Sequence, residues 1–278
     1  MEIYFITTIT LLGFIFGSFL NVVSLRFNTG KSLEGRSMCF SCAKTLSWYE
    51  LIPVVSWLSQ RGRCRGCSSR ISFELLASEL LTGLFFGLIA ARGFFTNNFI
   101  IDNAYVISTA YLLIITALFV VILFYDMRHK IIPDEFSFFF GILTFIGMFF
   151  FAFNNEIFTF VGFHMPSLIN MLAGILIPLP FVAIWYFSKG RQIGLGDPKL
   201  MVGIGFLLGI GKGISAIFIS FWIGALFAIA LLLTNKILHK TLVLKGKKSI
   251  MKTEIPFAPF LILGTLAVVI FGINILFI

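Results

Sequence analysis

Acidic residues are scarce in this chain: only twelve of its 278 residues are Asp or Glu. Most lie in polar segments or at the start of an apolar run, where solvation or a helix N-terminus accounts for them. Asp126 and Asp197 are harder to explain in this way. Two carboxyl groups brought together cannot both ionise easily, so they share a proton and divide the work of acid and base. Such a pair could activate water and protonate the carbonyl oxygen of a peptide bond.

Asp126 follows the apolar run Ala117–Tyr125, at the expected C-terminal end of a membrane helix. There the helix dipole disfavours an anion, and an aspartate becomes more costly toward the membrane core. A structural alternative is an interface residue paired with Arg128 or Lys130. No local pattern decides between the two.

Asp197 lies in the segment Gly194-Leu195-Gly196-Asp197-Pro198-Lys199. Asp followed by Pro suits the first positions of a helix, so helix capping is the structural alternative. Capping does not require the two preceding glycines. Gly194 and Gly196 would let the backbone turn tightly and let another chain approach, which makes them candidates for supporting substrate binding.

All four cysteines lie in one segment, as Cys39-x2-Cys42 and Cys64-x2-Cys67. Two such pairs are typical of a tetrahedral four-cysteine zinc site, in which four thiolates leave no open position for a reacting water. We therefore expect a structural zinc ion. Two disulfides are the alternative, and they require an oxidising compartment.

The composition requires that these groups be positioned by membrane helices. The chain is 59% hydrophobic and 12% charged, with a mean hydropathy of +1.02 and 36 phenylalanines, which excludes a soluble enzyme and a disordered protein. Since a spanning helix needs about 20 apolar residues, we expect an all-α polytopic membrane protein of about eight helices. The apolar stretches are 3–25, 75–91, 104–124, 136–153, 166–187, 200–210, 214–233 and 257–278.

Basic residues predict the orientation of these helices. With the N-terminus outside, the cytoplasmic loops are 26–74, 125–135, 188–199 and 234–256, and they hold 19 of the 21 Lys and Arg residues. Arg92 and Lys212 remain on the other side. This distribution follows the positive-inside rule, which also accounts for the net charge of +9 without a nucleic-acid partner. The cysteine segment and both aspartates are then cytoplasmic.

Other catalytic arrangements are not evident. The histidines lie in separate predicted loops, Ser18 and Ser24 have no evident base nearby, and Gly211-Lys212-Gly213 lacks the spacing of a phosphate-binding loop. The pattern Gly13-x3-Gly17 in the first apolar stretch favours close helix packing.

The order of these motifs resembles the type 4 prepilin peptidases, bacterial membrane aspartyl proteases named for a Gly-x-Gly-Asp motif. The resemblance covers nearly the whole chain and is carried by Gly17-Ser18-Phe19-Leu20-Asn21, the two cysteine pairs, Trp48-Tyr49-Glu50, Glu79-Leu80-Leu81-Thr82-Gly83, Asp126 with Pro133-Asp134, Gly194-x-Gly196-Asp197, and Ile255-Pro256-Phe257-Ala258-Pro259-Phe260. Ala258 stands where the family often has Gly, and Pro198 differs from many members.

The resemblance implies that Asp126 and Asp197 are the catalytic pair. It implies cleavage of the basic leader of prepilins or pseudopilins at the cytoplasmic face of the bacterial inner membrane, beside membrane lipid. Many members then methylate the new N-terminal residue, usually Phe, with S-adenosylmethionine, an activity that the cysteine segment tends to accompany.

We therefore expect three parts: a first membrane helix (1–25), a cytoplasmic zinc-binding loop (26–74), and a peptidase core of about seven helices (75–278). A peptidase without methyl transfer remains an alternative. An ion-coupled transporter with a zinc loop is another, although carriers usually place charged residues near the middle of the membrane. The sequence indicates neither the oligomeric state nor the residues that bind S-adenosylmethionine.

Overall fold

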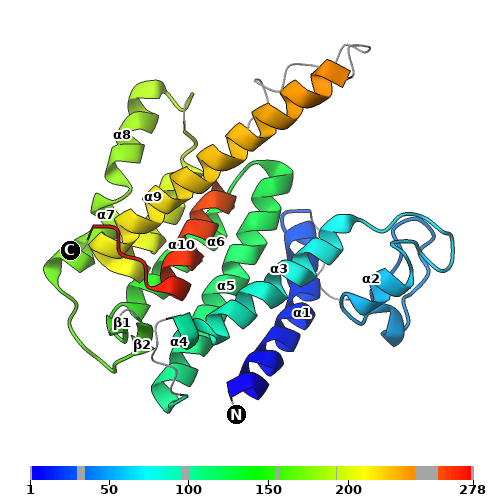
Figure 1. Ribbon diagram of the computed structural model, residues 1–278, viewed down its shortest axis with the longest axis horizontal. Coiled ribbons are helices and arrows are strands. Elements are labelled where there is room, and N and C mark those ends of the chain that lie inside the picture. The colour runs from blue at the N-terminus through cyan, green and yellow to red at the C-terminus, as the bar shows by residue number, and fades with distance from the viewer. Residues whose placement is uncertain are drawn as a thin grey trace. The chain divides into compact units, whose positions relative to one another are not determined.

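The computed structural model describes residues 2–29, 35–95, 101–154, 157–191, 193–241 and 256–276, with side chains described only to residue 234 in the helix that ends at 241 (Figure 1). Ile255 of the segment 255–260 and three of the twelve acidic residues, Glu34, Glu156 and Glu254, lie outside this part. The chain forms two compact units. The first comprises residues 1–125 and 153–160, and the second comprises residues 126–152 and 161–278.

Within the described residues, five segments are long and apolar enough to cross a membrane: Glu2–Arg26, Phe73–Ala90, Asn103–His129, Leu168–Ser188 and Gly196–Thr234. This confirms a mostly helical membrane protein. The helices α1 (Glu2–Arg26), α3 (Phe73–Ala90) and α5 (Asn103–His129) form the first three segments. The fourth contains α7 (Leu168–Leu176) and α8 (Leu179–Ser188), separated at Pro178, and α9 (Gly196–Thr241) contains the fifth.

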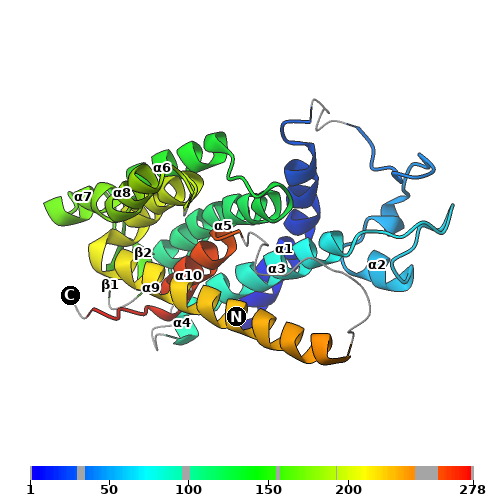
Figure 2. The same cartoon turned by 90° about the horizontal axis from the view of Figure 1, so that it is seen from above.

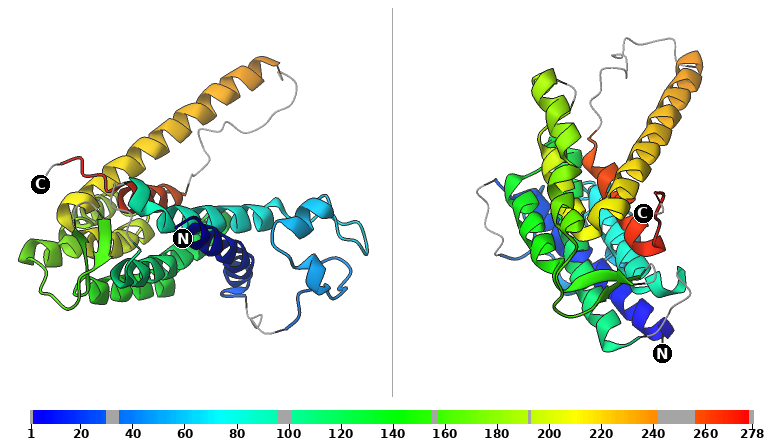
Figure 3. Two further views of the ribbon diagram at one scale, coloured as in Figure 1. Left: turned by 60° about the horizontal axis from the view of Figure 1, so that its bottom comes forward. Right: turned by 90° about the vertical axis from the view of Figure 1, so that its left-hand side faces the viewer.

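The remaining apolar helices are shorter. Helix α6 runs from Asp134 to Gly147 and α10 from Ala258 to Phe271, each with 14 residues. At 1.5 Å per residue such a helix is about 21 Å long, less than the hydrocarbon thickness of about 30 Å. Helix α9 contains the sixth and seventh expected stretches, and its helical geometry is interrupted at Gly209, near the end of the sixth, where φ is 71° and ψ is −174°. Figure 3 shows this helix in yellow and orange.

In the first unit, α1 and α3 lie side by side (Figure 1). A Cβ atom on Gly17 would meet the Cα of Glu79 at 2.7 Å, and one on Gly13 would meet the Cα of Gly83 at 2.7 Å. Since no side chain fits in this space, the Gly13-x3-Gly17 pattern serves close helix packing, as expected.

Between these two helices, the cysteine segment contains the 3₁₀ turn η1 (Trp48–Glu50) and the short helix α2 (Val55–Ser59). It continues directly into α3 (Figure 3). The short helix α4 (Arg92–Phe95) follows α3, and its Arg92 is 1% exposed. The Arg92 guanidinium donates hydrogen bonds to Ser108 and Thr109 of α5, and burial lowers its pKa to about 10, so it stays charged at neutral pH.

The all-α expectation is incomplete, because strands β1 (Phe151–Asn154) and β2 (Ile157–Phe160) pair with each other. The predicted apolar stretch 136–153 runs past the end of α6 into β1. Phe151, Phe153, Phe158 and Phe160 alternate with other residues, which is the period of a strand and not of a helix.

In the second unit, α6, α7 and α10 all pack on α9, and Figure 2 shows α6, α7, α8 and α9 gathered together. Glycines permit these contacts. A Cβ on Gly205 of α9 would meet the Ala173 carbonyl oxygen of α7 at 2.6 Å, and one on Gly264 of α10 would meet the Ala216 carbonyl oxygen of α9 at 2.5 Å. The polar groups described next lie in the last turn of α5 and in the first turns of α6, α9 and α10.

Candidate active site and metal centre

Asp126 lies in the last turn of α5 and is 4% exposed. Its carboxylate accepts a hydrogen bond from the backbone N–H of Ala258, the first residue of α10. The residue before α10, Phe257, provides no side-chain cap. Asp126 therefore satisfies an N–H group that a helix start otherwise leaves without a partner, and the positive end of the α10 dipole favours its negative charge.

The structural alternative pairs Asp126 with Arg128 or Lys130. The groups that act on its carboxylate are its buried surroundings and Ala258, and the side chains of Arg128 and Lys130 are not among them. The second carboxylate oxygen, Oδ2, is buried and has no hydrogen-bond partner among the described residues. A buried acceptor without a partner is costly, and a reacting water or substrate group would satisfy it.

Asp197 lies in the first turn of α9, which begins one residue earlier, at Gly196. Its position is therefore inside the helix and not at the cap that the Asp-Pro sequence predicts. The negative charge of Asp126 acts directly on Asp197. The structure thus brings together two carboxyl groups that lie 71 positions apart in the sequence, both in the second unit. Such a pair can share one proton.

The two motif glycines lie in different surroundings. A Cβ on Gly196 would approach the Ile132 Cβ to 3.0 Å, so this glycine lets the start of α9 pack against the loop before α6. A Cβ on Gly194 would meet nothing within 4 Å, which leaves an open approach to the helix start.

The four cysteines lie together in the first unit, with their Sγ atoms all within 4.8 Å of one another. All four are free thiols, and the Sγ atoms of Cys39 and Cys67 are 3.8 Å apart. A disulfide requires about 2.05 Å, whereas zinc–sulfur bonds of about 2.3 Å in a tetrahedron place the sulfurs about 3.8 Å apart. The donor set and spacing therefore fit one metal ion and not two disulfides.

The two cysteine pairs have the same backbone design. The N–H of Cys39 donates to the Lys44 carbonyl and that of Cys64 donates to the Ser69 carbonyl, both over 2.9 Å. Ala43 and Ser68, each four residues after the first cysteine, have φ values of 54° and 57°. Each turn thereby aims N–H groups at sulfur, and those of Cys42 and Ser41 lower the pKa of the Cys39 thiol to about 6.

Two family models match the chain. "Bacterial Peptidase A24 N-terminal domain" matches residues 11–93, the range that holds the four cysteines, and "Type IV leader peptidase family" matches residues 113–229, the range that holds both aspartates. The chain belongs to the type IV leader peptidase family.

Three curated relatives are similar to this chain over shares of its length that run from 44% to 95%. A "Prepilin leader peptidase/N-methyltransferase" of Bacillus subtilis (strain 168) is 29% identical over 95% of this chain and 93% of its own. A protein of the same name from Neisseria gonorrhoeae is 28% identical over 79% of this chain and 80% of its own. Another, from Myxococcus xanthus (strain DK1622), is 42% identical over 44% of this chain and 34% of its own. No solved structure matches the chain.

Two contacts of the candidate site could not be found by reasoning from the sequence. Lys199, two residues after Asp197, donates from Nζ to the Asp134 carboxylate over 2.6 Å, so Asp134 is more than an acid at a helix start. Ala258, the hydrogen-bond partner of Asp126, was noted only as a departure from the family pattern. The resemblance of the segment 255–260 to the family motif was the one signal that pointed to it.

Proposed function

We propose that this chain is a prepilin leader peptidase that also methylates the N-terminus it creates. The curated relatives that span most of the chain carry both activities in their name. The single observation that carries the peptidase assignment is that Asp126 and Asp197 lie near enough for the charge of the first to act on the second. In this proposal one carboxyl group takes a proton from water while the other protonates the carbonyl oxygen of the scissile bond.

Ala258 would orient the reaction. Its N–H holds one oxygen of the Asp126 carboxylate, which leaves the buried Oδ2 to face the reacting water. Gly194, with open space beside it, supports close approach of the substrate chain to Asp197. The substrates are prepilins or pseudopilins, in which a short basic leader precedes an apolar helix.

The second activity uses S-adenosylmethionine, which would supply the methyl group for the new N-terminal amine. We assign no residue to its binding. Cys39, Cys42, Cys64 and Cys67 would hold one zinc ion whose four thiolates are all structural, because a closed tetrahedral site has no position for a reactant. Phe40, Trp48 and Leu58 of the loop 26–74 are all more than half exposed, so the ion would supply much of its folding energy.

The membrane arrangement is also part of the proposal. Eight helical segments, counting α6, α10 and the two parts of α9, match the distribution of basic residues with the N-terminus outside. The zinc loop 26–74 and both aspartates then face the cytoplasm of a bacterial inner membrane, and residues 75–278 form the peptidase core.

The test is incubation of purified protein with a prepilin, with and without S-adenosylmethionine, read by intact mass. We expect a product without the leader, heavier by one methyl group only when the methyl donor is present. Cleavage without methylation would support the peptidase alone. Absence of cleavage by folded protein would contradict the assignment and favour an ion-coupled transporter.

A further inference from the structure

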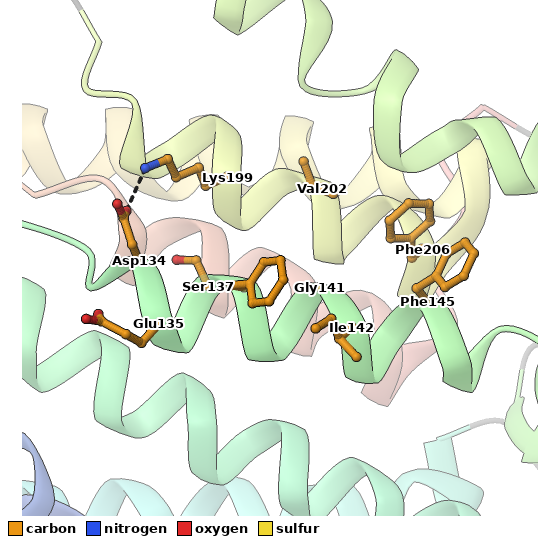
Figure 4. Close-up of a pocket in the computed structure, with 10 residues that line it drawn as sticks. Asp134, Glu135, Ser137, Gly141, Ile142, Phe145, Lys199, Val202 and Phe206 are labelled. Carbon is orange, nitrogen blue, oxygen red and sulfur yellow. Dashed lines mark hydrogen bonds and ion pairs between the residues drawn. The ribbon is translucent and has the colours of Figure 1, made fainter.

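A groove of about 730 Å³ runs along α6 and the first part of α9, within the second unit. Its walls are apolar and come from both helices: Phe138, Ile142, Phe145, Val202 and Phe206. The α6 residues recur every three to four positions and so follow one face of the helix. Figure 4 shows Ile142 and Phe145 on α6, and Val202 and Phe206 on α9, the helix above it in this view.

A missing side chain keeps the groove open. Gly141 lies in the middle of the α6 wall, and a Cβ added there would meet nothing within 4 Å. Phe138 remains 72% exposed and Phe145 42% exposed, so neither helix fills the space. A long apolar ligand could lie against both walls.

One end of the groove is charged. Asp134 and Glu135 open α6, Lys199 lies near the start of α9, and the Lys199 Nζ pairs with Asp134 there (Figure 4). Glu135 has no ion-pair partner among the described residues, so this end carries one uncompensated negative charge. The same end of α9 carries Asp197. The groove therefore leads from the candidate catalytic end of the helices into their apolar length.

We propose that this groove binds the apolar helix of the prepilin, with the basic leader at its acidic end. The proposal rests on the peptidase function above, because only that function supplies a substrate whose charged and apolar parts adjoin. Lipid is the competing occupant of an apolar groove at membrane depth. A phospholipid would bring its anionic phosphate to the end that already carries net negative charge, whereas a basic leader would neutralise it.

The position of Asp197 sets the register of the substrate. Residues two apart in a helix differ by about 200° around its axis, so Asp197 and Lys199 point to nearly opposite sides of α9. A chain cleaved at Asp197 must therefore cross the helix start, a distance of about 10 Å, before it enters the groove. Three extended residues span this distance. Contact with the groove should begin about four residues after the cleavage site.

Photo-crosslinking tests the occupant directly. A benzophenone amino acid would replace Phe138 in an Asp197→Asn background, in which prepilin binds without being cleaved. Phe139, which is 52% exposed and does not line the groove, is the matched control position. We expect adducts from position 138, mapped by mass spectrometry to the apolar segment from about the fourth residue onward, at several times the yield from position 139. Equal yields, or adducts with lipid alone, would overturn the proposal.

A second variant tests the groove in the active enzyme. Gly141→Leu should fill the groove and also favour the helix, because Leu has the higher helix propensity. We compare kcat/KM for a full-length prepilin with that for a peptide ending four residues after the cleavage site. The ratio should fall at least tenfold in Gly141→Leu and stay unchanged in Ile146→Phe, on the α6 surface outside the groove.

The outcomes separate the two proposals. An unchanged ratio in Gly141→Leu, including equal losses on both substrates, would contradict substrate binding in the groove. If the wild-type enzyme cleaved neither substrate, the proposed function would fail, and the crosslinks would still decide whether prepilin occupies the groove.

Discussion

The carboxylate of Glu79 on α3 accepts a hydrogen bond from the backbone N–H of Val54, 25 residues earlier, over 2.6 Å. Val54 has a φ of 63° and a ψ of −53°, and the N–H of Val55 donates to the Pro53 carbonyl over 2.6 Å. This is a γ-turn of the strained kind, costing about 1–3 kcal/mol for a β-branched residue. Glu79, itself 3% exposed, thus fastens a strained turn of the cysteine segment to a membrane helix.

Replacing Glu79 should loosen the zinc loop. Glu79→Ala would remove a hydrogen bond to a charged acceptor and leave the part-buried Val54 N–H without it, a loss of about 1–3 kcal/mol, whereas Glu79→Gln keeps an oxygen in place. We expect zinc to leave the Ala variant several-fold faster than wild type when a chelator is added, and the Gln variant to lie close to wild type. Equal release rates in all three proteins would show that this hydrogen bond does not hold the loop.

Each candidate catalytic aspartate should be indispensable. Asp126→Asn or Asp197→Asn should lower prepilin cleavage by at least about 1,000-fold, because an amide can neither accept a proton from water nor supply one to the carbonyl oxygen. Asn at position 126 still offers an oxygen to the Ala258 N–H, so the protein should fold and insert. The matched control is Asp102→Asn, because Asp102 accepts a hydrogen bond from the Tyr105 N–H at the start of α5, which Asn can also do. Substantial cleavage by either catalytic variant would rule out the aspartyl mechanism.

The sequence pointed to the candidate catalytic groups but not to how they are held. Asp126 could be singled out because it is an anion at the wrong end of its own helix. That it lies at the favourable end of another helix could not be foreseen, because Ala258 is 132 positions away and no local pattern links the two. The cysteine pairs were easier, because each pair forms its turn within six residues.

Other features were missed because their signals are short or ambiguous. The alternating phenylalanines of β1 and β2 extend an apolar run, and hydropathy alone cannot separate such a run from the end of a helix. The gap left by Gly141 depends on the neighbours of α6 in space. A single sequence indicates which face of a helix is apolar, but not which other helix packs against that face.

The zinc site should be removable without destroying the peptidase site. Cys64 is the buried member of the four cysteines, and Cys64→Ser replaces its thiolate by a poor zinc ligand. We expect about one zinc per wild-type chain and almost none in the variant, with residues 35–72 becoming sensitive to protease while prepilin cleavage persists. Ser41→Ala should keep its zinc, because Ser41 acts on Cys39 through its backbone N–H. A metal-free wild-type protein with an intact loop would refute the site.

Close packing of the first two membrane helices should fail when a side chain is added. Gly17→Leu would drive its Cβ into the Cα of Glu79, and backbone atoms cannot move aside as the end of a flexible side chain can. We expect a fall in melting temperature in detergent of several degrees, since overpacking costs about 1–3 kcal/mol. Ile15→Leu, on an exposed part of the same helix, should change it little. An unaltered melting temperature in Gly17→Leu would mean that α1 and α3 can separate without loss.

The stability of the zinc loop should depend on pH through Glu50. The Glu50 carboxylate accepts a hydrogen bond from the Ser47 N–H over 2.9 Å and pairs with Lys44 over 3.3 Å, and these contacts lower its pKa, Ser47 contributing most. A lowered pKa in the folded state means that the stabilisation is complete above the ordinary pKa, near 4.5, and is lost as the pH falls through the folded value. Glu50→Gln should therefore exchange amide hydrogens faster than wild type across residues 44–51 at pH 7, and this difference should shrink below about pH 4.5.

Zinc release on acidification affects both proteins, which carry the same cysteines, so comparing them at each pH isolates the effect of Glu50. Lys44→Met, which leaves the Ser47 hydrogen bond intact, should have the smaller effect at pH 7. A difference between Glu50→Gln and wild type that persists unchanged in acid would show that the carboxylate charge is not its source.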